Sequence, residues 1–124
     1  MQQLNYKNFK LTDAHTAGNE YDVFIADNDT SRILIKSPFI ANNSSSVQEI
    51  TINLKKFTGT DYEVIATDKL FLNESESGYP LLLMDLCLYS DIANPDKVSL
   101  IFNNTLNANE SIDIVFTYVK FLEV

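Results

Sequence analysis

Apolar and polar residues alternate most regularly within residues 47–54. Ile50, Ile52 and Leu54 fall on one face of an extended strand, and the residues between them are polar. This period of two predicts a strand with one buried face. Residues 58–61 then supply a short connection that contains a glycine, after which the alternation resumes. The whole segment therefore predicts a β-hairpin.

A second hairpin is predicted where two short apolar segments, Tyr21 to Ala26 and Arg32 to Lys36, flank the polar residues 27–31. Residues 4–11 also predict a strand, but their apolar phase slips along the segment, as a β-bulge would make it. Three further strands are predicted at Lys69 to Leu72, Val98 to Phe102 and Ile112 to Phe121.

The segment from Tyr79 to Tyr89 fits two structures. Pro80 could open a helix, because Leu82, Leu86 and Tyr89 have helical spacing. We favour a strand, since alternate side chains would then form one wholly apolar face suited to a central position in a sheet. The residues on that face would be Leu82, Met84, Leu86 and Leu88.

Strands at intervals of about ten residues, separated by turns rich in Asn, Ser and Thr, are typical of all-β proteins. The chain of 124 residues is short for two cores, since a second domain usually needs roughly 150 residues or more. Its hydrophobic fraction of 45% is enough to fill one core. We therefore predict one antiparallel β-sandwich over residues 1–124, jelly-roll-like, with about eight or nine strands.

The net charge of -8 argues against two classes of partner. Phosphates and anionic lipids attract cationic proteins, so we expect no nucleic-acid partner and no membrane partner. No apolar run approaches the roughly 18 residues of a membrane-spanning helix. Residues 1–7 lack the basic start and apolar stretch of a secretory signal, so we expect the mature form to be this chain.

The residues that usually carry catalysis or bind metals are scarce. One histidine, His15, and one cysteine, Cys87, cannot supply the three or four ligands of a zinc site. Three isolated glycines form neither a phosphate-binding loop nor a nucleophile elbow. We expect no catalytic residue, no cofactor and no metal, with His15 in a turn and Cys87 in the core.

Three polar features have a structural and a functional interpretation. Asp85 lies inside an apolar run, where a carboxylate is either hydrogen-bonded, solvent-facing or a functional acid, and we favour the first two. Asp27 and Asp29 alternate as in a calcium loop, but Arg32 stands where an EF-hand needs glycine, so we expect a polar loop. Six Asn-x-Ser/Thr triplets are interpreted as turns, including a mobile loop at 42–46.

The last predicted strand has two apolar faces where one would suffice. Alternate residues from Ile112 to Tyr118 fill its share of the core. The opposite face carries Val115, Val119 and Phe121, whereas a solvated face would be polar throughout. Either another segment or another subunit covers this face, and we favour a subunit. We predict that Val115, Val119 and Phe121 form a homo-oligomeric or lattice interface.

In its character the chain resembles the small accessory proteins of tailed-phage virions, which include capsid decoration or cement proteins, head fibres and neck or tail components. It is short, acidic and all-β, it is poor in Cys and His and rich in Asn and Ser, and it closes with the long strand pattern at 110–124. The resemblance implies a non-enzymatic structural role, a location in the virion, and partners that are copies of itself and a capsid lattice. The alternative is a carbohydrate- or receptor-binding β-sandwich that uses its polar loops, such as residues 73–79.

Overall fold

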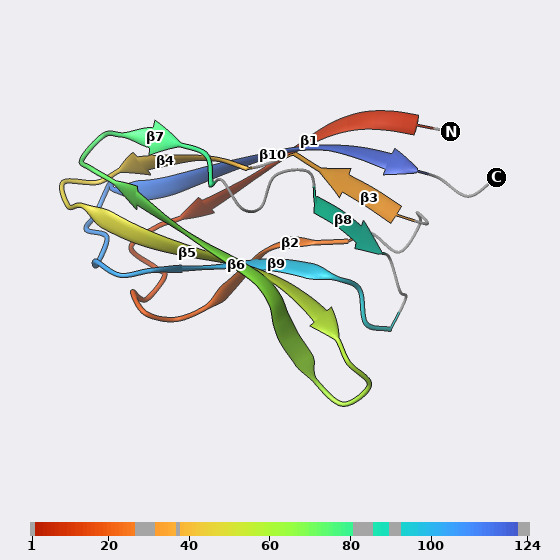
Figure 1. Ribbon diagram of the computed structural model, residues 1–124. Helices are drawn as coiled ribbons and strands as arrows, with labels where there is room; N and C mark the ends of the chain where they lie inside the picture. Colours follow the sequence, from red (N-terminus) through yellow and green to blue (C-terminus); the bar gives the residue numbers. More distant parts are fainter. Residues whose placement is uncertain (1, 27–31, 37, 81–85, 90–92, 122–124) are drawn as a thin grey trace.

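The computed structural model describes residues 2–26, 32–36, 38–80, 86–89 and 93–121, which form two antiparallel sheets packed face to face (Figure 1). Sheet A contains β1 (Gln2–Leu11), β3 (Arg32–Ile35), β4 (Phe39–Asn43), β7 (Ser77–Gly78), β8 (Leu86–Tyr89) and β10 (Ser111–Phe121). Sheet B contains β2 (Tyr21–Ile25), β5 (Gln48–Phe57), β6 (Tyr62–Leu72) and β9 (Lys97–Phe102), in the order β2-β9-β5-β6. The predicted all-β sandwich is confirmed, with ten strands among the described residues in place of the eight or nine expected.

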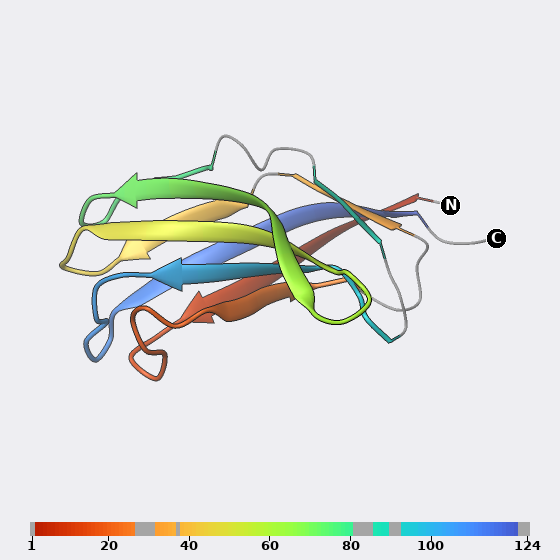
Figure 2. The ribbon, with the colours of Figure 1, turned by 60° about the horizontal axis from the view of Figure 1, so that its bottom comes forward.

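Strand β10 organises sheet A. Along one side it pairs with β1 from Gln2 opposite Phe121 to Leu11 opposite Ile112. Along the other side its first half pairs with β4 and its last residues pair with β3. The start of β1 and the end of β10 therefore lie together at one end of the sandwich, and the loops β1–β2, β4–β5, β6–β7 and β9–β10 gather at the other end (Figure 2).

The hydrophobic core lies between the sheets and follows the alternation of each strand. In β10, Ile112, Ile114, Phe116 and Tyr118 are buried, as their spacing predicts. Phe24 of β2 bridges the layers, since its ring packs against both Phe116 and Tyr118. The facing residues of sheet B are Ile50, Ile52, Leu54, Val98, Leu100 and Phe102.

Two predicted details are wrong. The segments Tyr21 to Ala26 and Arg32 to Lys36 do not form a hairpin, because β2 pairs with β9 in sheet B while β3 pairs with β10 and β8 in sheet A. Two short apolar strands joined by a polar connection look alike whether they pair or cross between layers. The expected bulge in residues 4–11 is also absent, since β1 keeps one register along β10.

The apparent phase slip in β1 has a different cause. Lys7 lies on the inward face, opposite Phe116, and its ammonium group sits 5.1 Å from the centre of the Phe24 ring. Tyr6, the neighbouring aromatic residue, points to the outward face opposite Thr117. A cation over an aromatic face is a favourable way to place a lysine beside a core. The strand therefore stays regular although its hydrophobic pattern does not.

The other expected elements differ in their bounds. The predicted hairpin of residues 47–66 is confirmed as β5 and β6, and Gly59 in its turn has a φ of 99°. The strand expected at Lys69 to Leu72 is the continuation of β6. Strand β8 occupies the end of the ambiguous segment Tyr79 to Tyr89, and residues 81–85 lie outside the described residues.

The loop expected to be mobile at 42–46 is instead tied down. Asn42 belongs to β4 and is completely buried. Its side-chain amide donates to the carbonyls of Ser46, Leu72 and Asn73, at 2.9, 3.2 and 3.0 Å. A buried amide that donates to three backbone carbonyls joins the end of β6 to β4. This Asn-x-Ser triplet is therefore an internal structural element.

Candidate assembly surface

The outward face of β10 carries the three residues that the sequence singles out. Val115, Val119 and Phe121 are each partly exposed, and so is Thr117 between them. Their neighbours in the strand alternate with them and are buried in the core up to Tyr118. The backbone pleat therefore presents Val115, Val119 and Phe121 on the side of sheet A that faces away from sheet B.

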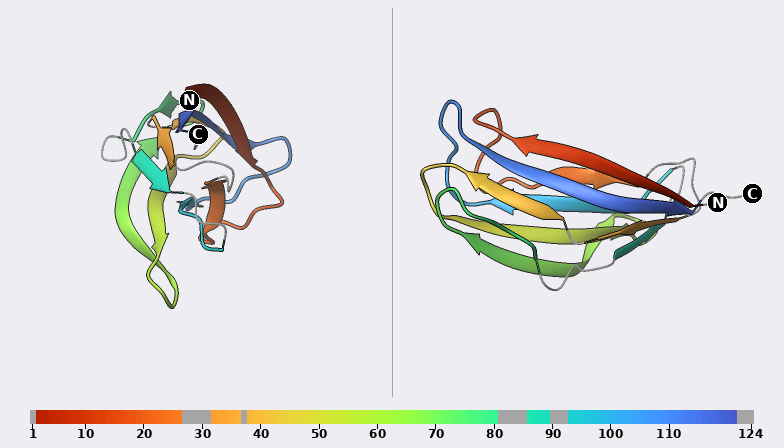
Figure 3. Two further views of the ribbon diagram at one scale, coloured as in Figure 1. Left: turned by 90° about the vertical axis from the view of Figure 1, so that its right-hand side faces the viewer. Right: turned by 90° about the horizontal axis from the view of Figure 1, so that it is seen from above.

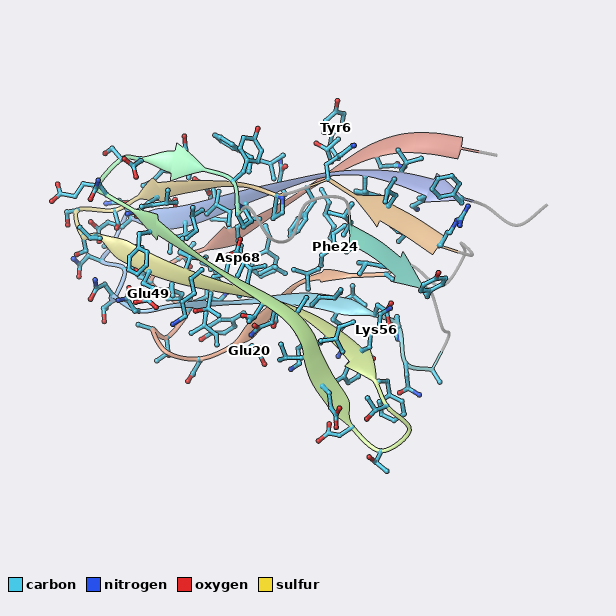
Figure 4. All side chains as sticks on the ribbon, viewed as in Figure 1. Tyr6, Glu20, Phe24, Glu49, Lys56 and Asp68 are labelled. Carbon is cyan, nitrogen blue, oxygen red and sulfur yellow. The ribbon has the colours of Figure 1, made fainter. Side chains whose placement is uncertain are left out.

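Residues from three neighbouring strands extend this apolar surface. Tyr6 of β1 stands opposite Thr117, is 69% exposed and points away from the sandwich (Figure 4). Leu34 of β3 stands opposite Val119, and Phe39 of β4 stands opposite Val115. Tyr79, 56% exposed, packs its ring 5.2 Å from that of Phe39. We call the following set the outer patch: Tyr6, Leu34, Phe39, Tyr79, Val115, Val119 and Phe121.

Charged groups border the outer patch at both ends. Near the chain ends, the Arg32 guanidinium lies 4.5 Å from the centre of the Phe121 ring. Near the loops, Asp113 forms an ion pair with Lys10 at 3.7 Å and accepts a hydrogen bond from the Asn43 amide. An apolar centre with a polar rim is the usual composition of a protein interface.

A shallow groove runs beside the patch between β1 and β10. Its first part, a hollow of about 230 Å³, is lined by Asn8, Lys10, Asp113 and Val115 together with the strand backbones. Lys10 also lines a second hollow of about 330 Å³ at the loop end, which includes Asp13 and Glu110. Both hollows are open to solvent, and the first is lined mainly by apolar surface, so they suit a broad protein surface better than an enclosed small ligand.

Glu110 is fixed at the loop end of this groove. Its carboxylate accepts hydrogen bonds from the backbone N–H groups of Asn107 and Ser45, at 2.8 and 2.7 Å. These bonds favour the charged form and hold the pKa of Glu110 below its ordinary value. The loop that precedes β10 is thereby attached to the loop that follows β4.

The outward face of sheet B has a different composition. Glu20, just before β2, accepts hydrogen bonds from Ser99 of β9 and Asn53 of β5, at 2.7 and 3.0 Å, and pairs with Lys55 at 2.7 Å. Ser99 and Asn53 are buried beneath it. Figure 4 shows Glu20 on the side of the molecule opposite Tyr6.

The charges of this cluster stabilise one another. Burial acts to raise the pKa of Glu20, but hydrogen bonds from Lys55, Ser99 and Asn53 outweigh it and the pKa is lowered. The hydrogen bond to Glu20 raises the pKa of Lys55. Both groups are therefore charged at neutral pH, and they make the centre of this face polar, while Phe71 and Val64 are exposed on its β6 edge.

The remaining candidates from the sequence are placed as follows. His15 lies in a turn, as expected, where its Nδ1 accepts a hydrogen bond from the Thr12 N–H at 3.0 Å and its ring packs edge-on against Tyr21. Among the residues that the structure describes, no three His, Cys, Asp or Glu side chains are grouped to hold a metal ion. No helix that could cross a membrane is found in the described part of the chain either.

Three candidates cannot be placed. Asp85 and the calcium-like pair Asp27 and Asp29 lie outside the described residues. Cys87 belongs to β8, but its side chain is likewise outside the description, so its place in the core stays a prediction.

Sequence reasoning found the β10 part of the outer patch and missed the rest. Tyr6, Leu34 and Phe39 join the patch only because β1, β3 and β4 flank β10 in particular registers. Each lies far from β10 in the sequence, and alternation within one strand carries no information about its neighbours. The exposed Tyr6 had a local signal, since it breaks the apolar phase of its strand.

Comparisons with known proteins bear on the fold. No family model matches the chain, and no curated protein matches it. Among solved structures, a chain from Bacillus endospore appendages, described as a novel family of disulfide-linked pili, is similar with a TM-score of 0.57 and 10% sequence identity. The match covers 98% of this chain and 89% of that chain. At this identity the similarity shows a shared fold.

Chains of infectious bursal disease virus are also similar. The structure of the Gx strain gives a TM-score of 0.47 at 8% identity, and virus-derived T=1 particles give 0.45 at 13% identity. Each match covers 98% of this chain and 32% of the viral chain. The present chain thus spans about a third of the length of these viral proteins.

Proposed function

We propose that this chain is a non-enzymatic structural subunit that assembles with copies of itself and with a larger protein particle. In its finer form the proposal is a virion accessory protein, such as a capsid decoration or cement protein. The observation that carries it is the outer patch, an apolar surface on the outward face of a sheet in a protein of net charge -8.

The physical argument starts from the cost of leaving this patch in water. Contiguous apolar patches on small monomeric proteins usually mark contact sites. Burial of aromatic and aliphatic side chains gains roughly 25 cal/mol per Å² of apolar surface, so a patch of seven such residues is a substantial driving force for association. The sandwich similarity to a pilus chain over nearly its whole length is consistent with a structural role.

The test is a pair of matched substitutions on the two outward faces. Val119→Glu places a carboxylate in the centre of the outer patch, and Ile101→Glu places one on β9 in sheet B. Both positions are partly exposed strand residues, so both variants should stay folded by circular dichroism. We expect Val119→Glu to weaken self-association at least tenfold by light scattering, because an unpaired carboxylate would be desolvated.

Ile101→Glu should leave association unchanged. If Val119→Glu unfolds the domain, the outer patch is intramolecular core and the proposal fails. If it changes neither folding nor association, the interface lies elsewhere. The finer form is tested with the same two variants by measuring their binding to purified capsids: Val119→Glu should lose binding and Ile101→Glu should keep it.

Carbohydrate binding is the second candidate, and one observation favours it. Tyr79 and Tyr6 expose aromatic rings on the outer patch, and sugars stack on such rings. A glycan array distinguishes the two functions. Binding that is lost in Tyr79→Ala while the chain stays monomeric would favour this candidate over assembly.

A further inference from the structure

The edges of the two sheets differ in length and regularity. Strand β2 has five residues and a register irregularity, β7 has two residues and β8 has four. Strand β6 has eleven residues, with a bulge where its register with β5 shifts. Strand β1 has ten residues and no shift. Short strands and bulges protect sheet edges against pairing with other chains, and β1 has neither; its inward-pointing Lys7 instead disfavours any partner strand that has no acidic residue opposite it.

The edge of β1 is a regular backbone template. Within the described ranges, β1 pairs with no strand other than β10. From Tyr6 to Leu11, every second residue directs its N–H and C=O away from β10, because the groups of an antiparallel strand alternate between its two sides. The same stretch carries Lys7 and Lys10 and no acidic residue, and because Asp113 of β10 pairs with Lys10, the positive charge of this edge comes from Lys7.

A complementary edge exists on the other sheet. The bulge of β6 lies near Ile65, and the strand is regular from Ala66 onward. Residues 61–76 contain five carboxylates and a single cation, Lys69, and on the regular part of β6 the carboxylate that a partner strand would meet is that of Asp68. The carboxylates are those of Asp61, Glu63, Asp68, Glu74 and Glu76.

The two edges also lie where a chain of subunits would need them. Figure 3, in its right-hand view, shows β1 and β6 along opposite margins of the sandwich. A contact between different surfaces of two copies leaves one free edge of each kind at the ends. Such heterologous contacts propagate into rings or open filaments.

We propose that β1 of one copy pairs antiparallel with β6 of a second copy, so that sheet A of the first continues into sheet B of the second. The pairing places Lys7 opposite Asp68. Both side chains point to the inward faces of their sheets, since Lys7 stands opposite Phe116 and Asp68 stands opposite Ile52. This inference rests on the proposed function and adds a second contact between copies, along the sheet edges rather than over the outer patch.

The same register satisfies the neighbouring positions. Phe9, which packs against the core, comes opposite the small Ala66, which also packs against the core. Tyr6 comes opposite Lys69 on the outward side, where a cation can lie over the ring. Cross-strand pairs of these kinds stabilise antiparallel sheets. Pairing of β1 with a second β1 would instead bring the lysines of two basic strands together.

A cysteine pair tests the register directly. Asn8 and Thr67 are both exposed on outward faces and would stand opposite each other across the contact, where antiparallel Cα atoms lie within disulfide range. In the full chain with Cys87→Ser, we would introduce Asn8→Cys and Thr67→Cys separately and together. After mild oxidation at a concentration where the wild type associates, products are sized on a non-reducing gel.

The proposal expects a ladder of covalent oligomers from the double variant and a dimer from a mixture of the two single variants. Each single variant alone should remain uncrosslinked. A dimer from Asn8→Cys alone would show β1 paired with β1, and one from Thr67→Cys alone would show β6 paired with β6. Either result overturns the proposal, and so does the absence of any crosslink in associated protein.

A charge exchange provides an independent measurement. Lys7→Glu should weaken association about tenfold, and adding Asp68→Lys to the same chain should restore it, whereas Asp68→Lys alone should weaken it. No rescue in the double variant contradicts the pairing. A wild type that stays monomeric at every concentration contradicts the proposed function itself, whereas an associating wild type that fails both tests contradicts only the β1–β6 contact.

Discussion

The outward faces of the two sheets are both formed by antiparallel strands, but their exposed side chains differ: the centre of one face is polar and that of the other is apolar. On sheet B, Glu20 lies over Asn53 and Ser99 and pairs with Lys55, so polar groups of the chain satisfy one another. On sheet A, the corresponding face presents Val119 and the rest of the outer patch. The centre of sheet B's outward face is therefore polar, although Phe71 is exposed on its β6 edge, whereas the outer patch on sheet A is apolar across several strands.

The comparison shows why net charge alone is a poor guide to association. A net charge of -8 repels copies at long range. The described carboxylates that cause it, however, lie mainly in loops and on sheet B rather than on the outer patch. Screening at physiological salt limits that repulsion to distances of about 8 Å. Short-range burial of apolar surface then decides whether copies associate.

The largest effect is expected between the two faces of β10 itself. Phe116 is buried against Phe24, so Phe116→Ala should lower the free energy of unfolding by about 3–5 kcal/mol. Val115, the next residue in the strand, is partly exposed, and Val115→Ala should cost about 1 kcal/mol or less. Urea denaturation of dilute monomers measures both values. Equal losses would mean that the outward face is also core.

A smaller effect is expected on sheet B. Because Glu20 is exposed, water can replace it as the acceptor for Ser99 and Asn53 in Glu20→Ala, so each lost hydrogen bond should cost about 0.5–1.5 kcal/mol. The melting temperature should therefore fall while self-association stays unchanged. Loss of association in this variant would break the contrast between the faces.

The pH dependence of stability identifies the same cluster. Because the folded-state pKa of Glu20 is lowered, its contribution is present above the ordinary pKa of 4.5 and is lost as the pH falls through the folded-state value. The raised pKa of Lys55 contributes below its ordinary value of 10.5 and is lost as the pH rises through the folded-state value. In Glu20→Ala both slopes should flatten, and thermal melts from pH 3 to 11 would show whether they do.

The sequence was sufficient to predict the fold class and, for individual strands, which face is buried. The alternation of β5 and β10 predicted which residues are buried, because a period of two reports directly on a strand with one buried side. The partners of each strand were not predictable in this way. The chain crosses from sheet B to sheet A between β2 and β3, where the local sequence predicts a hairpin, because strand pairing depends on contacts far away in the sequence.

The candidate surface was likewise predictable within one strand but not across strands. Val115, Val119 and Phe121 stood out as an unneeded apolar face on one strand. The groups that surround them required the register of β10 against three other strands. The local sequence predicts a loop at Asn42, because Asn is common in turns. Nothing in that local sequence shows that the Asn42 amide donates hydrogen bonds to three backbone carbonyls.

The central claim is that a partner covers the outward face of sheet A and leaves that of sheet B in solvent. Hydroxyl-radical footprinting of the wild-type protein at low and at high concentration tests it most directly. We predict that oxidation of Val115, Val119 and Tyr6 falls severalfold in the associated protein, while oxidation of Ile101 on sheet B does not change. Equal oxidation of the outer patch in the dilute and associated protein, or protection centred on Ile101, would contradict the account.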